Sequence, residues 1–302
     1  MKIAIAGGTG LIGKALVDYL HKNGHEVIIL TRQTQSNSSS GSPRYISWLN
    51  KDSSSIVEEL TEVDAFINLA GSTINTRWTE KGKEQIVESR LHVVEELYRL
   101  IRTLTVKPKV LINASAVGFY GTSEEETFTE SSIKPGTDFL AQTVVKWESA
   151  VRKIEDLGVR TVYCRFGVVL DSNAGALPQM GLPYRLFIGG TIGNGRQWLS
   201  WIHIQDIVRG IVFAIENNDV RGPVNFTAPE PVQMQEFGKT IATVLNRPHW
   251  LPLPGFALKL LLGEMSLLIL EGQRVFPEAL LHHGFSFQYP HLFPALKEIY
   301  KK

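Results

Sequence analysis

The sequence predicts an α/β fold, in which a doubly wound parallel sheet is joined to a smaller, mainly helical C-terminal lobe. Short apolar runs alternate with amphipathic segments as far as residue 170, which is the pattern of parallel strands joined by crossover helices. A glycine-rich turn follows the first of these runs directly. After Asp171 glycine and proline become frequent, and the regular alternation ends.

The individual elements follow from these apolar runs. Strands are predicted at 2–6, 27–30, 44–48, 64–69, 109–114, 161–170 and 224–226, and helices at 11–23, 56–60, 79–103, 138–157 and 206–217. The Ser- and Asn-rich stretch 33–42 is predicted to be a solvated loop. Residues 175–195 are expected to be loop-rich, and the tail from Met234 onward mainly helical.

Composition limits the class of protein. With 43% hydrophobic and 20% charged residues, the 302-residue chain has enough apolar material for a sizeable core. Its formal net charge is +1 and no long basic run is present, so nucleic acid is not expected as a partner. The single cysteine, Cys164, excludes an intramolecular disulfide and a cysteine-based zinc site, and favours a cytoplasmic location.

No segment has the length of a membrane span, which needs roughly 20 apolar residues. Glycines interrupt the N-terminal apolar run, which is not the pattern of a signal peptide. The most hydrophobic segment, 256–270, is broken by Lys259, Gly263 and Glu264. We therefore expect no membrane partner, and we predict that 256–270 is a buried or dimer-facing helix.

The sequence GGTGLIG at 7–13 lies between the first predicted strand and the first predicted helix. Gly7 permits a tight turn, Gly10 lets the backbone approach a pyrophosphate, and Gly13 lets the helix lie close to the strand. The helix N-terminus adds unpaired N–H groups and a positive dipole. In this context the motif predicts a Rossmann dinucleotide site, the alternative being a glycine-rich turn without a ligand. The predicted contacts are Gly7, Thr9, Gly10, Leu11 and Ile12.

The end of the second strand indicates which dinucleotide is preferred. A site for NAD usually places Asp or Glu about 20 residues after the glycines. This chain has Thr31 and Arg32 there, and Arg32 can hold a 2′-phosphate by a charge-assisted contact, the alternative being a solvated surface arginine. The predicted cofactor is therefore NADP(H). Its domain would span 1–170, completed by about 206–228, and 171–205 with 229–302 would form the smaller substrate lobe.

Further motifs carry a family resemblance. NLAG at 68–71, SAVGFYG at 115–121 and WIHIQD at 201–206 are similar to segments of the extended short-chain dehydrogenase/reductases, the family of NAD-dependent epimerases and dehydratases. RW at 77–78, SRL at 89–91, KWE at 146–148 and the tail 263–285 resemble an atypical subgroup with a distinctive C-terminal helical region. The resemblance implies cofactor contacts from Thr31, Arg32, Leu69, Ala70, Arg90 and Lys146.

The residues themselves support two of these contacts, Leu69 and Ala70, and offer an alternative role for a third, Arg90. Leu69, Ala70 and Gly71 come at the carboxyl end of a predicted strand, where doubly wound sheets bind ligands. Arg90 falls inside an amphipathic helix, so an ion pair on the surface or between the lobes is its alternative role.

Typical members of the resembled family use a Ser or Thr, a Tyr and a Lys, with the last two spaced YxxxK. The tyrosine transfers a proton while the nicotinamide transfers hydride. Counting back four residues from Lys146 gives Gln142, whereas alignment on Glu148 places Leu140 and Val144 at the tyrosine and lysine positions. Neither register supplies a tyrosine, so the usual proton relay is predicted to be missing.

Tyr120, Ser115 and His203 are the candidates to replace it. His203 has the right unperturbed pKa for acid–base work, but a histidine between apolar neighbours also suits a structural role. Tyr120 either faces the nicotinamide or packs against the glycine loop. Ser115 either takes part or bonds to backbone, since an ungapped match on Tyr120 and Gly121 places Ala116 at the usual serine position.

The remaining candidates are less specific. Arg77, Trp78 and Arg165 are candidates to shape the substrate pocket, while Trp198, Trp201 and His203 form either a pocket wall or core between the lobes. No HExxH or clustered-carboxylate pattern predicts a metal site.

The sequence thus favours an NADP(H)-dependent oxidoreductase or epimerase acting on an unknown small carbonyl or hydroxyl compound. The alternative is a non-catalytic protein that senses NADP(H) and presents its helical tail to a partner. A homodimer is one option for apolar helix faces such as Val93, Val94 and Leu97, and burial against the sheet is the other.

Overall fold

A computed structural model of the chain describes residues 1–32, 43–49 and 54–301. The stretch 33–42, predicted above to be a loop, lies outside the described residues.

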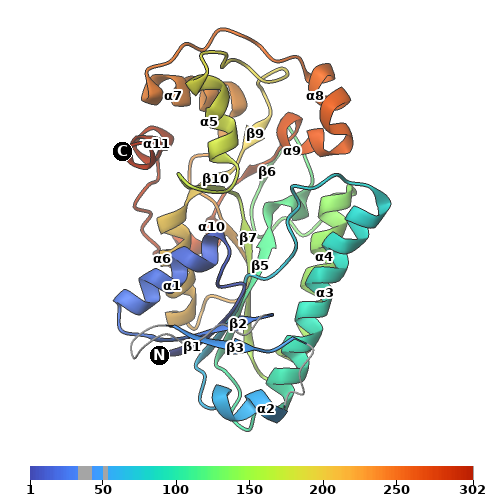
Figure 1. The fold of residues 1–302 in the computed structure, drawn as a ribbon, viewed down its shortest axis with the longest axis vertical. Helices are drawn as coiled ribbons and strands as arrows, with labels where there is room; N and C mark the ends of the chain where they lie inside the picture. Colours follow the sequence, from blue (N-terminus) through green and yellow to red (C-terminus); the bar gives the residue numbers. More distant parts are fainter. Residues whose placement is uncertain (33–42, 50–53, 302) are drawn as a thin grey trace.

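The centre of the structure is a seven-stranded sheet in which every pairing is parallel (Figure 1). Its strands, in spatial order, are β11 (Gly222–Phe226), β7 (Arg160–Phe166), β5 (Val110–Ala116), β4 (Ala65–Asn68), β1 (Lys2–Ala6), β2 (Glu26–Thr31) and β3 (Arg44–Ser47). The chain runs outward from β1 through β2 to β3 and then returns to β4 on the other side of β1. Parallel sheets of this kind bind ligands at such a reversal, outside the carboxyl ends of the strands.

Helices cover both faces of this sheet, as expected for a doubly wound fold. One face carries α1 (Leu11–Lys22) and α6 (Ile204–Glu216), and the other carries α3 (Glu80–Thr103) and α4 (Phe139–Glu155) (Figure 1). The short α2 (Ser54–Val57) and η1 (Glu58–Leu60) lead from β3 to β4. Apolar side chains of each layer form a separate core against the sheet. The predicted α/β fold is confirmed.

For the apolar face of α3, the sequence left open a contact between subunits or burial against the sheet. Val93, Val94 and Leu97 are buried among the side chains that cover the sheet, together with Val151 and Ile154 of α4. The apolar face of α3 thus packs inside the molecule.

The smaller lobe has a third apolar core of its own. It is built from α5 (Leu177–Arg185), α7 (Met234–Leu245) and α11 (Leu292–Ile299), with the short strands β8 (Val168–Leu170), β9 (Trp198–Leu199), β10 (Trp201–His203) and β12 (Val232–Gln233). The connection that follows α7 leads through α8 (Gly255–Leu262), η3 (Gly263–Ser266), α9 (Leu267–Leu270), β13 (Arg274–Val275) and α10 (Glu278–His282). β13 pairs with β6 (Thr127–Phe128), which ties this tail to the sheet domain.

Two predictions about this region were wrong. The predicted strand 161–170 is two strands, β7 and β8, which belong to different sheets. They separate at Gly167, where a Cβ would lie 2.4 Å from the carbonyl oxygen of Ser200. The segment 175–195 contains α5, although Pro183 lies inside it, because Leu177 and Tyr184 of this helix are buried in the lobe core.

The prediction of a single buried helix at 256–270 was wrong as well, while its dimer-facing alternative stays a prediction. This stretch is α8, η3 and α9 instead of one helix, and Gly263, with φ of +57°, separates the first two. Leu258 is buried, but other apolar side chains of this stretch are not, since Phe256 is 75% and Leu260 is 86% exposed. In the part of the chain that the structure describes, no helix combines the length and the hydrophobicity of a membrane span.

Candidate functional site

The bend between β1 and α1 brings three backbone segments into close contact. Gly7 has φ of +84°, and a Cβ there would lie 2.6 Å from the carbonyl carbon of Leu69. A Cβ on Gly13 would lie 2.3 Å from the oxygen of Gly7. A side chain at either glycine would therefore push β1, α1 and the end of β4 apart, and the bend depends on their absence.

The N-terminus of α1 is open to an anion. Its N-cap is Gly10, no side chain caps it, and its first turn contains no acidic residue. The amides of Leu11, Ile12 and Gly13 therefore keep the unpaired N–H groups and the positive dipole end of the helix. A Cβ on Gly10 would meet only the carbonyl oxygen of Gly7, at 3.4 Å, so among the described residues no side chain beyond those of its chain neighbours lies within 4 Å of that position. This arrangement fits a pyrophosphate.

The neighbouring strand ends lie at the same edge. Thr31 is the last residue of β2 and Arg32 follows it, exposed, while Leu69 and Ala70 follow β4. Because β2 and β4 both pair with β1, these residues flank the bend on its two sides. The structure therefore brings together the predicted contacts of the bend and of both strand ends.

Arg90 of α3 reaches the same edge. Its Nη1 donates to the carbonyl oxygens of Ser72 and Ile86, at 3.2 and 2.8 Å, and its guanidinium lies 5.0 Å from the ring of Trp147. A Cβ on Gly71 would lie 3.3 Å from the guanidinium carbon, so Arg90 contacts the end of β4. Burial lowers the pKa of Arg90 to about 10. None of the ion pairs among the described residues includes Arg90, which leaves this half-buried cation available to an anion.

Lys146 is exposed on α4, one residue before Trp147. Gln142, one turn earlier on the same helix, donates from Nε2 to the carbonyl oxygen of Gly136. Lys146 therefore lies in solvent beside Trp147, whose ring faces Arg90.

Two of the three candidate catalytic residues share a buried polar network. Ser115, at the end of β5, donates to Glu148 Oε1 at 2.6 Å. Arg165 of β7 binds the same carboxylate through Nε and Nη2, at 2.9 and 2.8 Å. Its Nη1 donates to the hydroxyl of Tyr120 at 3.0 Å, and that hydroxyl donates to Asn225 Oδ1 at 2.8 Å.

The surroundings of Tyr120 are apolar apart from this network. Its ring is 4% exposed and stacks on Phe128 at 5.2 Å, with Phe119 packed edge-on at 5.4 Å. Burial raises the pKa of Tyr120, while the charge of Arg165 and the hydrogen bonds from Arg165 and to Asn225 act against this rise. The phenol is therefore neutral at physiological pH, and it is held next to a permanent cation.

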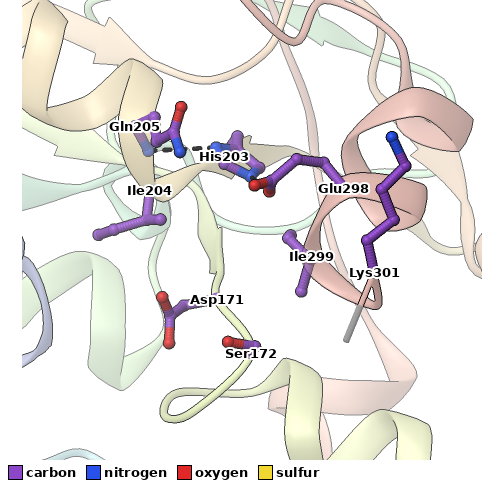
Figure 2. A pocket seen from close by; sticks show the side chains of 8 residues that line it. All are labelled: Asp171, Ser172, His203, Ile204, Gln205, Glu298, Ile299 and Lys301. Atoms are coloured by element: carbon purple, nitrogen blue, oxygen red, sulfur yellow. Dashed lines mark hydrogen bonds and ion pairs between the residues drawn. The ribbon is translucent and has the colours of Figure 1, made fainter.

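His203 lies in a different set of contacts, at the N-cap of α6. Its Nδ1 accepts from the backbone N–H of Gln205 at 3.2 Å, and its Nε2 lies 3.0 Å from Glu298 Oε2 of α11 (Figure 2). The ring also packs on Tyr289, with 4.0 Å between centroids. Burial lowers the pKa of His203, although Glu298 opposes the shift.

Figure 2 shows His203 at the edge of an open pocket of about 190 Å³, with Asp171 and Ser172 on its other side. Both ring nitrogens of His203 already have partners in the protein. This geometry is that of a residue that joins α6 to α11.

The remaining candidates, three tryptophans and two arginines, also differ in their burial and partners. Trp201 is fully buried in the lobe core and donates to the carbonyl oxygen of Glu230, so it belongs to the core. Trp198 donates to Glu124 and lies under Arg274, at 4.8 Å. Trp78 is buried, bonds to the oxygen of Ile74 and packs on Phe139. Arg77 is exposed, and Arg165 is a member of the buried network.

Comparison with known proteins agrees with this geometry. Residues 3–226 match the model of the NAD-dependent epimerase/dehydratase family, and residues 253–299 match a domain of unknown function. The epimerase family protein YfhF of Bacillus subtilis is 50% identical, covering 99% of this chain and 98% of its own. The epimerase family protein SSP1921 of Staphylococcus saprophyticus is 42% identical, covering 98% of each chain.

The chain belongs to the NAD-dependent epimerase/dehydratase family.

Solved structures of this family are close to the whole chain. The human epimerase family protein SDR39U1, crystallised with NADPH, has 35% identity and a TM-score of 0.87, with 99% of both chains covered. A nucleoside-diphosphate sugar epimerase from Corynebacterium glutamicum has 34% identity and a TM-score of 0.79, covering 99% of this chain and 58% of its own. The resemblance to extended short-chain dehydrogenase/reductases is thereby confirmed.

Within this family, the positions that alignment on Glu148 assigns to tyrosine and lysine hold Leu140 and Val144. Val144 is buried against Tyr120 and its aromatic neighbours. Leu140 lies against the turn before Tyr120, since its Cβ would be 3.6 Å from a Cβ on Gly118. Apolar side chains from α4 therefore pack beside Tyr120.

The sequence did not reveal two members of the buried network. Glu148 served only as an alignment marker, and Asn225 was an unremarked residue of a predicted strand. Glu148 lies on the apolar face of α4, which is the face expected to be buried. Because a buried carboxylate needs a cation beside it, this position could have predicted a buried ion pair. Asn225 offered no comparable signal.

Proposed function

We propose that this chain binds NADP(H) and acts as an oxidoreductase or epimerase-type enzyme on a small carbonyl or hydroxyl compound. The observation that supports binding most strongly is the bend at 7–13, where close backbone packing and an uncapped helix end leave room for a pyrophosphate. The NADPH bound by the human relative supports the same cofactor. The proposal keeps the predicted division into a cofactor domain at 1–170 with 206–228 and a substrate lobe at 171–205 with 229–302.

The residues around the bend have distinct roles in this proposal. Arg32, in the place of the carboxylate of an NAD site, binds the 2′-phosphate. Arg90, a desolvated cation paired with carbonyl oxygens, stabilises a phosphate or ribose oxygen. Lys146 binds the ribose next to the nicotinamide from the exposed face of α4. A bound nicotinamide supplies or accepts the hydride.

Tyr120 is our candidate for the proton-exchanging group. Because burial raises its pKa, its Oη carries a proton at neutral pH and suits donation to the oxygen of a carbonyl as that carbonyl is reduced. Nη1 of Arg165, at 3.0 Å, stabilises the phenolate that remains. The hydroxyl exchanges its bond to Asn225 Oδ1 for one to the substrate. We therefore propose reduction of a carbonyl as the favoured direction.

Ser115 and Glu148 act on Arg165 in this scheme. The carboxylate of Glu148 accepts hydrogen bonds from two nitrogens of Arg165 and from the hydroxyl of Ser115. Ser115 thus helps to orient the carboxylate, and the carboxylate fixes the position of the guanidinium. His203 does not take part in proton transfer and instead holds α11 to α6.

Replacement of Tyr120 by Phe tests this function. It removes the proposed proton donor and leaves the bend at 7–13 intact, so NADPH binding should stay within about twofold while carbonyl-dependent oxidation of NADPH falls by 10²-fold or more, a magnitude typical of general acids. Both are measured by nicotinamide fluorescence and absorbance with a panel of aldehydes and ketones.

Tyr163→Phe is the matched control. Tyr163 is also buried, and its hydroxyl bonds to Glu155 at 2.6 Å, away from the proposed site. Equal loss of turnover in both variants would show that a buried phenol is needed for folding alone, and would remove Tyr120 from the mechanism.

A sensor of NADP(H) is the second candidate function. It is favoured by the fact that the hydroxyls of Tyr120 and Ser115 both have partners within the protein. The apolar Leu140 and Val144, at positions that hold the family's proton-transfer residues, favour it too. Wild-type protein that binds NADPH at micromolar concentration and oxidises it with no carbonyl compound of the panel would establish the sensor and exclude the enzyme.

A further inference from the structure

The smaller lobe leaves many large apolar side chains in solvent at one end of the molecule. Trp250 is 65% exposed, and Phe256 and Leu260 of α8 are more exposed still. We call this surface the apical patch, and its residues are Leu186, Phe187, Ile188, Trp250, Leu251, Leu253, Phe256, Leu260 and Leu261. Soluble monomers rarely expose so many neighbouring apolar side chains, and such surfaces mark sites of contact with a protein or a membrane.

Backbone hydrogen bonds join the parts of the apical patch into one surface. Trp250 donates to the oxygen of Gly189 at 2.9 Å, and Leu253 donates to Thr191 at 2.8 Å. Gly193 donates back to Leu253 at 2.9 Å. A Cβ on Gly255 would lie 3.9 Å from Cα of Gly193, so α8 starts directly beside this pairing.

The exposure of Phe187 is built into the backbone. Phe187 has φ of +63°, a conformation that is costly for a bulky residue and that clusters at functional positions. The indole N–H of Trp250 donates to its carbonyl oxygen at 2.9 Å, and the guanidinium of Arg247 lies 4.5 Å from the centre of its ring. These contacts hold Phe187 on the surface beside a cation.

The charges within the two chain segments that carry the patch are all positive. Segments 182–193 and 246–262 contain Arg185, Arg247 and Lys259 and no Asp or Glu. The next carboxylate after α8, that of Glu264, is paired with Lys83 at 2.6 Å. The patch thus combines Trp, Phe and Leu with uncompensated cations, which is the composition of surfaces that lie on anionic membranes.

The same charges argue against a second copy as the occupant. A two-fold dimer places a patch against itself, so Arg247 and Lys259 of one subunit would add to the positive charge of the same surface on the other. A negatively charged lipid surface satisfies both the apolar and the basic side chains.

We propose that the apical patch docks on the surface of an anionic lipid bilayer. The connection from α7 to α8 runs across the end of the molecule that lies farthest from α2, so docking there leaves the central sheet away from the lipid (Figure 1). Docking of this kind inserts side chains into the interface and needs no spanning helix. The proposal does not depend on the function proposed above.

Sedimentation with vesicles tests the docking. We expect the full chain to pellet with vesicles of phosphatidylcholine and phosphatidylglycerol, to stay in solution with phosphatidylcholine alone, and to be released at about 1 M NaCl, where the Debye length is about 3 Å. Each cation near an anionic surface contributes about fivefold to partitioning, so R247Q/K259Q should lower it about 25-fold. F256S/L260S should lower it by about tenfold or more.

The matched control is V106S/I133S, which removes two exposed apolar side chains outside the patch and should bind vesicles as the wild type does. Since Phe256 and Leu260 are exposed, F256S/L260S should keep the thermal midpoint of the wild type, and unaltered NADPH fluorescence shows that the cofactor domain is intact. The proposal is overturned if the protein pellets equally with neutral and anionic vesicles, or if V106S/I133S loses as much vesicle binding as F256S/L260S. It is also overturned by a concentration-dependent dimer in analytical ultracentrifugation that F256S/L260S abolishes while no vesicle binding is seen, because the patch is then a contact between copies.

Discussion

At the scale of single residues, the structure separates the candidates by their partners. Arg32 and Lys146 are exposed at the edge where a dinucleotide fits, whereas Ser115 and Tyr120 are held in a buried network around Arg165. His203 is tied to Glu298 in the other lobe. The candidate residues thus have three different kinds of surroundings, and each kind calls for a different experiment.

Arg32 is expected to select the phosphorylated cofactor. Arg32→Ala removes a charge-assisted contact to the 2′-phosphate, which should weaken NADPH binding by about 1.5–3 kcal/mol and leave NADH binding nearly unchanged. Titration of tryptophan fluorescence with each dinucleotide measures both constants. The exposed Arg102, at the end of α3, is the control for the loss of one surface arginine. If NADPH and NADH weakened equally, Arg32 would not be the selecting residue.

Glu148 is expected to be important for folding. Glu148→Gln leaves the buried guanidinium of Arg165 without its counter-charge, and loss of one partner of a buried ion pair costs about 3–5 kcal/mol. The free energy of unfolding, from urea titration, measures this. Glu96→Gln, which breaks the exposed pair with Arg99, should cost less than about 1 kcal/mol. If the two variants lost similar free energies of unfolding, the Glu148–Arg165 ion pair would not have the expected importance for folding.

At the scale of elements, the contact between α6 and α11 should make stability depend on pH. Burial lowers the pKa of His203, so the unfolded chain takes up a proton before the folded protein does. Stability should therefore be complete above the unfolded pKa of about 6.5 and decrease as pH falls through it toward the lower folded pKa. Glu298, Asp206 and Asp171 oppose the shift and reduce its size.

The measurement is the free energy of unfolding between about pH 8 and pH 5 for the wild type and for His203→Gln. The variant should lose less stability over this range than the wild type. His291→Gln removes an exposed histidine that contacts Glu230, and it should follow the wild type. A His203→Gln variant with the pH dependence of the wild type would show that His203 is not the titrating group.

The elements also show what the sequence could predict. The alternation of apolar runs with amphipathic segments predicted the sheet and its covering helices, because parallel strands buried on both faces are continuously apolar. It did not predict α5, whose Pro178, Gly181 and Pro183 indicate a loop. That helix is stabilised by the lobe core around Leu177 and Tyr184, a tertiary contact that no local pattern contains.

The candidate site was predictable to the same extent. The bend at 7–13 has a partly local cause, since Gly10 and Gly13 meet backbone that the strand–turn–helix order brings near, whereas Gly7 meets Leu69 at the end of β4. The buried network has no such local cause. Ser115 and Tyr120 lie in one segment, and Glu148, Arg165 and Asn225 come from three others. Only the spatial order of β5, β7 and β11 with α4 brings these four segments together.

At the scale of the whole molecule, the tail is bound to both domains. Asp206 of α6 accepts the backbone N–H groups of Gln288 and Tyr289, at 2.7 and 2.9 Å. β13 pairs with β6, and Glu264 binds Lys83 of α3. The C-terminal segment is therefore a structural part of both domains, and these contacts leave uncovered the part of it that belongs to the apical patch.

The position of α11 sets the order in which the two domains can form during synthesis. The sheet is complete when β11 ends at Phe226, so it can assemble while the following residues are still being added. The core of the smaller lobe includes Leu292, Leu296 and Ile299. A growing chain therefore carries a finished sheet beside an open lobe until α11 is translated, and this interval is when its apolar surfaces most need a chaperone.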